Sequence, residues 1–146
     1  MRITICLKPI DANDIDFLHE LFKERTKYPG KLRFRKKDIP TYKDHKKFVT
    51  SFIRNRQAHP YESWDIILYE NRMVGALVLK KDGEWGYHVL MNYQNKGIGQ
   101  QALFLLIKRN PKKTLVARIN PDNDRAQHIA KKFGHKLAYL TFVRNP

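Results

Sequence analysis

The sequence is poor in cysteine and in long apolar runs, and each shortage excludes a class of protein. Cys6 is the only cysteine among 146 residues, so a disulfide framework or a cysteine-based metal site within the chain is excluded. The longest apolar runs, such as ALFLLI at 102–107, fall far short of the roughly 20 residues of a membrane helix. No charged and then apolar leader opens the chain. We therefore expect a cytoplasmic protein without a metal or a membrane partner, in which Cys6 is a small buried apolar residue.

Acidic residues are also scarce, with 14 Asp and Glu against 29 Lys and Arg and a net charge of +15. The excess of basic residues is uneven along the chain. Residues 23–56 hold 13 basic and three acidic residues, and residues 108–146 hold ten basic and two acidic residues. Such a surface attracts anions, whether a phosphorylated cofactor, a nucleotide-linked substrate, nucleic acid or an acidic protein face. The alternative is a set of solvated lysines on a thermally robust protein.

Apolar residues are plentiful enough for a packed core, because 42% of the chain is hydrophobic and 12% is aromatic. A chain of this length fits one domain, residues 1–146. RITICLKPI at 2–10 alternates like a half-buried strand, and Asp11 is placed to cap a helix that follows it. YPGK at 28–31 then breaks the chain, and Thr41 with Asp44 forms the capping-box pattern of a second helix.

The second half of the chain predicts a meander followed by alternating helices and strands. Gly134 stands where it can end the last helix. The expected elements are strands at 63–69, 74–80 and 84–90, a helix at 97–109, a strand at 114–120, a helix through 126–133 and a final strand at 136–143. The order βααβββαβαβ indicates one mixed α/β domain with a predominantly antiparallel sheet.

The stretch QNKGIGQ at 94–100 places two glycines between an expected strand and an expected helix. Gly97 and Gly99 lack Cβ, so phosphate oxygens can approach the backbone N–H groups of the first helical turn. The positive end of the helix dipole adds to the attraction. The alternative is that both glycines simply ease a tight turn.

The spacing of QNKGIG fits the signature Gln/Arg-x-x-Gly-x-Gly/Ala and resembles the acetyl-CoA loop of the GNAT acetyltransferases. NPDNDRAQHIAKKFGHK at 120–136 is similar to the second CoA-side motif of that family, and the expected element order matches, with one strand fewer at the end. The resemblance implies a GNAT-like fold whose sheet is splayed between its fourth and fifth strands. It also implies acetyl-CoA as co-substrate, no metal, and an N-acetyltransferase activity.

The same resemblance implies which residues bind the cofactor. The backbone N–H groups of the loop would hold the CoA pyrophosphate, and the loop consists of Asn95, Lys96, Gly97, Ile98, Gly99 and Gln100. The backbone near Val89 would pair with the pantetheine arm and polarise the thioester carbonyl. Asn123 stands where family members often contact the pantetheine end, although it is equally placed to cap the following helix.

Acetyl transfer to an amine needs a proton acceptor, and the strand at 84–90 offers two. Strand alternation puts Glu84 and His88 on the same face. Glu84 matches the place of a general-base glutamate in several family members; its alternative is a solvated carboxylate beside a turn. His88 has an ordinary pKa that suits proton transfer, or it merely lines the pocket.

The usual acid of the family is missing. Counting from Asn123, the tyrosine that protonates the leaving thiolate in many relatives is replaced by Ala130. Water, Tyr87 or Tyr139 could serve instead, or the thiolate leaves unassisted. His135 stands where the family commonly has phenylalanine.

The basic segment at 23–56 lies in the region that flanks the acceptor entrance in this fold, so we expect an acceptor that is anionic overall. Candidates are a nucleotide-linked amino sugar, a protein N-terminus followed by acidic residues, or an RNA. KLRFRKK at 31–37 interleaves cations with an aromatic ring and could hold a phosphate or a base. The alternatives to an enzyme are a nucleic-acid-binding module and a non-catalytic acetyl-CoA-binding protein on the same scaffold. The sequence leaves open whether the protein is a monomer or a homodimer.

Overall fold

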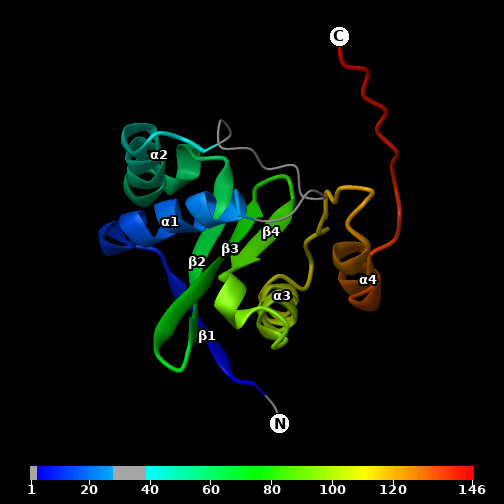
Figure 1. Cartoon of the computed structure of the whole chain (residues 1–146), viewed down its shortest axis with the longest axis horizontal. Coiled ribbons are helices and arrows are strands. Elements are labelled where there is room, and N and C mark those ends of the chain that lie inside the picture. Colours follow the sequence, from blue (N-terminus) through cyan, green and yellow to red (C-terminus); the bar gives the residue numbers. More distant parts are fainter. Residues whose placement is uncertain (1–2, 28–38) are drawn as a thin grey trace.

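The computed structural model describes residues 3–27 and 39–146, in which four strands and four helices form (Figure 1). The strands are β1 (Ile5–Pro9), β2 (Tyr61–Tyr69), β3 (Arg72–Lys80) and β4 (Trp85–Val89). The helices are α1 (Ile15–Arg25), α2 (Tyr42–Arg54), α3 (Ile98–Arg109) and α4 (Asp124–Lys132). In the described residues the chain therefore runs βααβββαα.

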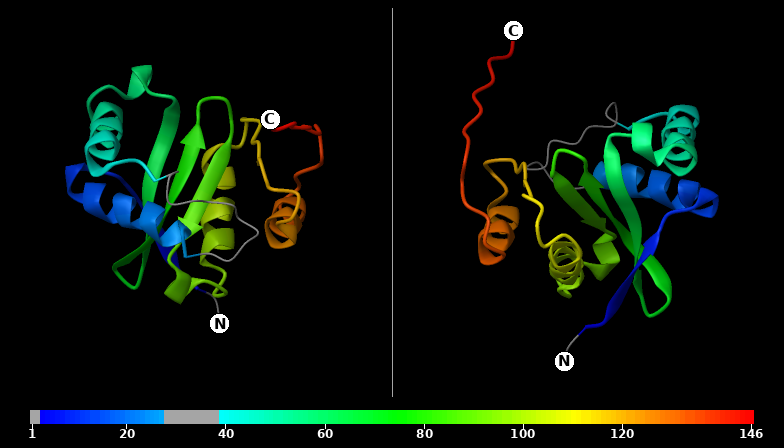
Figure 2. Two further views of the ribbon diagram at one scale, coloured as in Figure 1. Left: turned by 45° about the horizontal axis from the view of Figure 1, so that its top comes forward. Right: turned by 180° about the vertical axis from the view of Figure 1, so that it is seen from behind.

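The four strands form one antiparallel sheet in the order β1-β2-β3-β4, so each strand pairs with its neighbours in sequence. Glu70 and Asn71 both have positive φ angles, of 51° and 61°, which suits the tight turn between β2 and β3. Helices α1 and α2 cover one face of the sheet, and α3 and α4 lie on the other (Figure 2). The predicted mixed α/β fold with an antiparallel sheet is confirmed.

Two apolar clusters fill the spaces between the sheet and its two helix layers. Ile66 and Ile67 are both fully buried although they are adjacent, because successive side chains of a strand point to opposite faces. Ile66 packs with the residues of α1 and α2, and Ile67 with those of α3. Burying one such side chain stabilises the fold by about 1.5–3 kcal/mol.

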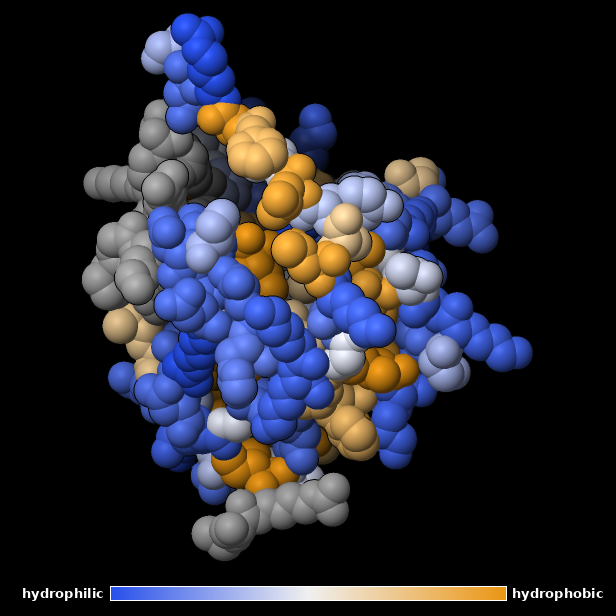
Figure 3. Space-filling view, turned by 90° about the vertical axis from the view of Figure 1, so that its right-hand side faces the viewer, coloured by the Kyte–Doolittle hydropathy of each residue, from blue (hydrophilic) through white to orange (hydrophobic). Residues whose placement is uncertain are grey.

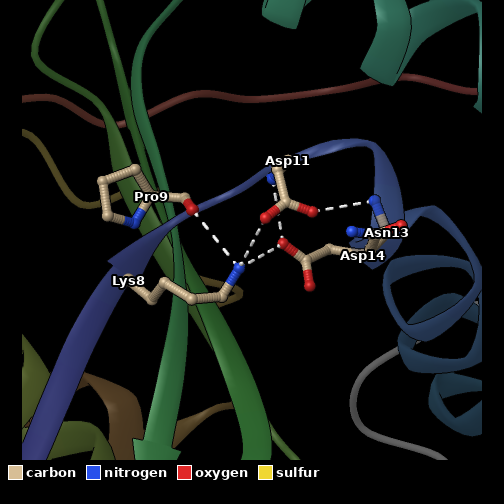
Figure 4. A network of polar contacts seen from close by, with 5 residues as sticks. All are labelled: Lys8, Pro9, Asp11, Asn13 and Asp14. Carbon is tan, nitrogen blue, oxygen red and sulfur yellow. Dashed lines mark hydrogen bonds and ion pairs between the residues drawn. The ribbon is translucent and has the colours of Figure 1, made fainter.

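A short 3-10 helix, Ala12–Asp14, leads into α1, and the predicted cap Asp11 caps this 3-10 helix within a network of polar contacts (Figure 4). The N-cap residue of α1 itself is Asp14, which makes no side-chain cap hydrogen bond. Its Oδ1 accepts from the backbone N–H of Asn13 at 2.8 Å. Asp14 Oδ2 accepts from the backbone N–H of Asp11 at 2.9 Å and from Lys8 Nζ at 2.7 Å. The hydrogen bond to Asp14 raises the pKa of Lys8. Because β1 ends inside this network, the direction in which the chain enters α1 is set by residues close in sequence.

Two other predicted boundaries are also confirmed by local contacts. Thr41 Oγ1 accepts from the backbone N–H of Asp44 at 3.1 Å and caps α2. Gly134 follows α4 with a φ of +87°, the left-handed conformation that ends helices. Cys6, by contrast, is exposed on β1, so the expectation of a buried cysteine was wrong.

The last two predicted strands do not form. The 114–120 segment makes a single parallel bridge, in which Val116 O accepts from Trp85 N at 3.0 Å and Val116 N donates to Gly83 O at 2.9 Å. No fifth strand therefore joins the sheet beyond β4 in the described residues. A strand needs a hydrogen-bonded neighbour, and strand propensity alone does not supply one.

The predicted final strand at 136–143 is extended without a partner and runs away from the body of the molecule (Figures 1 and 2). Its apolar residues are 71–91% exposed: Leu137, Tyr139, Leu140, Phe142 and Val143. Figure 3 shows apolar side chains along this segment and on the body next to it. Within the described ranges, no helix is both long and apolar enough to cross a membrane.

Candidate functional site

The turn that leads into α3 has the open backbone that the sequence predicted. Gly97 stands just before the helix with a φ of +81°, and no side chain caps the helix. A Cβ built on Gly97 would meet no atom within 4 Å, so the space beside this residue is open. The first N–H groups of a helix have no carbonyl one turn earlier to bind, and here they face that space from the positive end of the helix dipole. The turn is therefore able to bind an anion.

Gly99 has a different reason to lack a side chain. A Cβ at this position would collide with the ring of Tyr87 on β4. Tyr87 stacks on Trp85 with an angle of 13° between the rings. Burial raises the pKa of Tyr87, so its hydroxyl keeps its proton at neutral pH. Of the two hydroxyls suggested by the sequence as proton donors, Tyr87 is thus enclosed near α3, whereas Tyr139 is 89% exposed.

Side-chain hydrogen bonds tie this turn to the neighbouring elements. Gln94 Nε2 donates to Val89 O at 3.0 Å, which joins the turn to the end of β4. Lys132 Nζ donates to Gln100 Oε1 at 2.9 Å and brings a cation of α4 beside the start of α3. Asn123 Oδ1 accepts from the backbone N–H of Ala126 at 3.1 Å, so this oxygen caps α4. Lys132 lies within the motif at 120–136, but nothing in the sequence singled it out.

The C-terminal end of α4 is joined to β4 through His135. Trp85 Nε1 donates to His135 Nε2 at 3.0 Å, so Nδ1 carries the ring proton and donates to Ala130 O at 3.1 Å. Ala130, which stands in place of the family's tyrosine, is 5% exposed. Replacing phenylalanine by His135 therefore adds a polar link between strand and helix.

On the opposite face of β4, Glu84 and His88 flank Gly86. Gly86 is exposed, and a Cβ built on it would meet no atom within 4 Å. Glu84 forms ion pairs with Arg118 and, at 3.5 Å, with Lys80. The two predicted catalytic residues lie on one face as the alternation indicated, but each has its own charged partners. An open strip of backbone separates them.

His88 contacts Glu24, a residue of the last turn of α1. Glu24 Oε1 lies 3.4 Å from His88 Nε2 and accepts from the backbone N–H of Met91 at 2.8 Å. Burial, together with the charge of Arg25, lowers the pKa of His88 to about 4, and Glu24 opposes that shift. His88 is therefore neutral at pH 7. Sequence reasoning missed Glu24 because nothing in the α1 pattern distinguishes it from an ordinary surface carboxylate.

The basic segment contributes a cationic surface on α2. Four cations and two hydroxyls line a shallow hollow of about 410 Å³: Lys43, Lys46, Lys47, Thr50, Ser51 and Arg54. KLRFRKK at 31–37 lies outside the described residues, so its predicted role in binding is untested. Within the described ranges, no group of three or more His, Cys, Asp or Glu residues could hold a metal ion.

Comparison with known proteins identifies this arrangement. A family model described as an acetyltransferase (GNAT) domain matches residues 4–136. A search of curated protein sequences finds no significant match.

Several solved structures share the fold. RimL, a ribosomal L7/L12 alpha-N-protein acetyltransferase in complex with coenzyme A, is 20% identical with a TM-score of 0.73, covering 90% of this chain and 79% of that one. An acetyltransferase from Thermus thermophilus is 19% identical with a TM-score of 0.70, covering 92% and 88%. The microcin C7 self-immunity acetyltransferase MccE, in complex with acetyl-CoA and AMP, is 19% identical with a TM-score of 0.66, covering 89% and 77%.

Proposed function

The chain belongs to the GNAT family of acetyltransferases, and on that premise we propose that it moves the acetyl group of acetyl-CoA to a primary amine of an anionic acceptor. The observation that carries the proposal is the pair of open glycines on either side of β4. Gly97 opens the backbone beside the start of α3, and Gly86 opens the face toward α1 and α2. A donor and an acceptor can therefore reach β4 from different sides.

The donor binds on the α3 side. The backbone N–H groups from Asn95 to Gln100 hold the pyrophosphate, and the Lys132 ammonium beside Gln100 adds a positive charge. The backbone near Val89 contacts the pantetheine arm and polarises the thioester carbonyl. Asn123 contacts the pantetheine end through its amide nitrogen, since its oxygen caps α4.

The acceptor amine lies over Gly86, between Glu84 and His88. Its nitrogen attacks the thioester carbon, a C–N bond forms, the C–S bond breaks, and CoA leaves as a thiolate. The amine proton passes to His88 or, directly or through water, to Glu84. The thiolate takes a proton from water or from Tyr87, whose raised pKa keeps it in the protonated form.

The acceptor is a protein N-terminus followed by acidic residues, or an amine linked to a nucleotide. Arg25 beside the His88 ring and the cationic hollow on α2 both favour negative charge. The RimL and MccE structures support these two acceptor classes by analogy, because one protein acetylates a ribosomal protein and the other binds AMP with acetyl-CoA.

The test measures release of free CoA from acetyl-CoA with four acceptors: a peptide with an acidic N-terminal sequence, a basic peptide, a nucleotide amino sugar and an RNA. We expect turnover with an anionic amine and none with the basic peptide. Gly86→Val should abolish turnover by filling the acceptor space, while acetyl-CoA affinity and melting temperature stay near wild type, because the open backbone accepts a branched residue in a strand. Turnover by Gly86→Val at the wild-type rate would contradict the placement of the acceptor.

A further inference from the structure

Glu24 joins three parts of the chain that are far apart in sequence. It comes from the last turn of α1, its Oε1 accepts from the Met91 N–H at 2.8 Å, and the same oxygen lies 3.4 Å from His88 Nε2. The side chains of Glu24 and His88 are only 19% and 13% exposed. A carboxylate in the last turn of a helix opposes the helix dipole, so helix propensity does not explain its position.

A carboxylate beside one imidazole nitrogen determines which nitrogen of a neutral histidine carries the proton. Because Glu24 Oε1 is an acceptor, the Nε2 of His88 holds the proton and the basic lone pair is on Nδ1. The same arrangement orients histidines in catalytic triads and at metal centres. The contact thus fixes both the orientation of the ring and its tautomer.

Two charges that act on His88 come from the end of α1. Among the described residues they are Glu24, which raises the pKa of the imidazole, and Arg25, which lowers it. The residue opposite His88 on β3 is Ala76, which is uncharged. Burial is the largest cause of the lowered pKa of His88, and the two charges at the end of α1 adjust that pKa in opposite directions.

Resting on the proposed function, we infer that Glu24 is a positioning residue, which holds the His88 ring in one orientation and in the Nε2-protonated form for proton transfer from the acceptor. Through Met91 the same carboxylate also fixes the turn Met91–Tyr93, which leads from β4 to the cofactor loop. One side chain on the acceptor side of the sheet thereby joins the proton acceptor to the donor site.

The test combines Glu24→Gln with Arg25→Gln as its matched control. Glu24→Gln keeps an oxygen for the Met91 N–H but removes the charge, so acetyl-CoA affinity and melting temperature should stay near wild type. We expect kcat to fall by about 10- to 100-fold. The pKa of His88 should fall in Glu24→Gln and rise in Arg25→Gln. The acidic limb of the pH profile of kcat should move in the same direction as that pKa in each variant.

Nitrogen NMR of the His88 ring separates this inference from the proposed function, because it requires no acceptor. The wild-type ring should be the Nε2-protonated tautomer, and Glu24→Gln should give a mixture. If the tautomer is unchanged in Glu24→Gln, or if both variants shift the pKa of His88 in the same direction, the inference is wrong. If the tautomer behaves as expected but no amine is acetylated, the proposed function fails and the role of Glu24 in holding the ring remains.

Discussion

At the scale of single residues, Gly97 and Gly99 have different surroundings, although the sequence motif grouped them together. Gly97 is open and left-handed, as an anion-binding turn requires, whereas Gly99 makes room for Tyr87. The motif predicted one role for both, an opening for phosphate, although glycine allows either arrangement. It could not predict the second reason, since the Tyr87 ring reaches Gly99 only after β4 has packed against α3.

Gly97→Ala tests the donor site at this scale, with Gly134→Ala as its control. Both glycines are left-handed, with φ angles of +81° and +87°, and neither Cβ would meet an atom within 4 Å. Each substitution should therefore lower the free energy of unfolding by a similar amount, about 1 kcal/mol. Only Gly97→Ala puts a methyl group where the pyrophosphate approaches, so it should weaken acetyl-CoA binding about 10-fold or more.

Calorimetric titration with acetyl-CoA measures the difference, and thermal melts of the free proteins check that the strain is matched. Equal losses of affinity in the two variants would mean that strain, rather than the pyrophosphate site, explains the effect. Unchanged affinity in folded Gly97→Ala would place the cofactor elsewhere.

Among the elements, those whose boundaries depend on neighbours in sequence were predicted well. Asp11, Thr41 and Gly134 each act through a contact within a few residues, so the starts and ends of helices could be read directly. The segments at 114–120 and 136–143 have strand-like sequences but need a distant partner for their hydrogen bonds. The alternation of β4 likewise placed Glu84 and His88 on one face, while their partners Arg118 and Glu24 came from elements whose approach no local pattern encodes.

The Glu84–Arg118 ion pair connects the 114–120 segment to the start of β4, and this gives Glu84 two distinguishable roles. As a general base, Glu84 should lose about 100-fold or more in kcat when changed to Gln, with acetyl-CoA affinity unchanged. We expect this result, and only a small effect from Arg118→Gln, since an exposed ion pair contributes little to stability. Steady-state kinetics of the two variants decide between the roles. A drop of only two- or three-fold in both would leave Glu84 as a connection between elements, and His88 as the proton acceptor.

At the scale of the whole molecule, the proposed function assigns the donor and the acceptor to the two faces of one sheet. The start of α3 packs in one apolar cluster through Ile98, and the side chain of His88 contacts Glu24 of α1 on the opposite face. The net charge of +15 predicted an anionic ligand without saying where it binds, because charge attracts over distances larger than any one site. The described structure offers two candidate sites for an anionic ligand: the start of α3 and the hollow on α2.

Hydrogen exchange of the backbone amides, with and without saturating acetyl-CoA, tests directly whether the donor binds at the start of α3. We expect exchange to slow about 10-fold or more at residues 95–100, whose N–H groups would bind the pyrophosphate, and to stay unchanged across α2. Protection at residues 43–54 with none at 95–100 would contradict the assignment and place the anion in the hollow on α2.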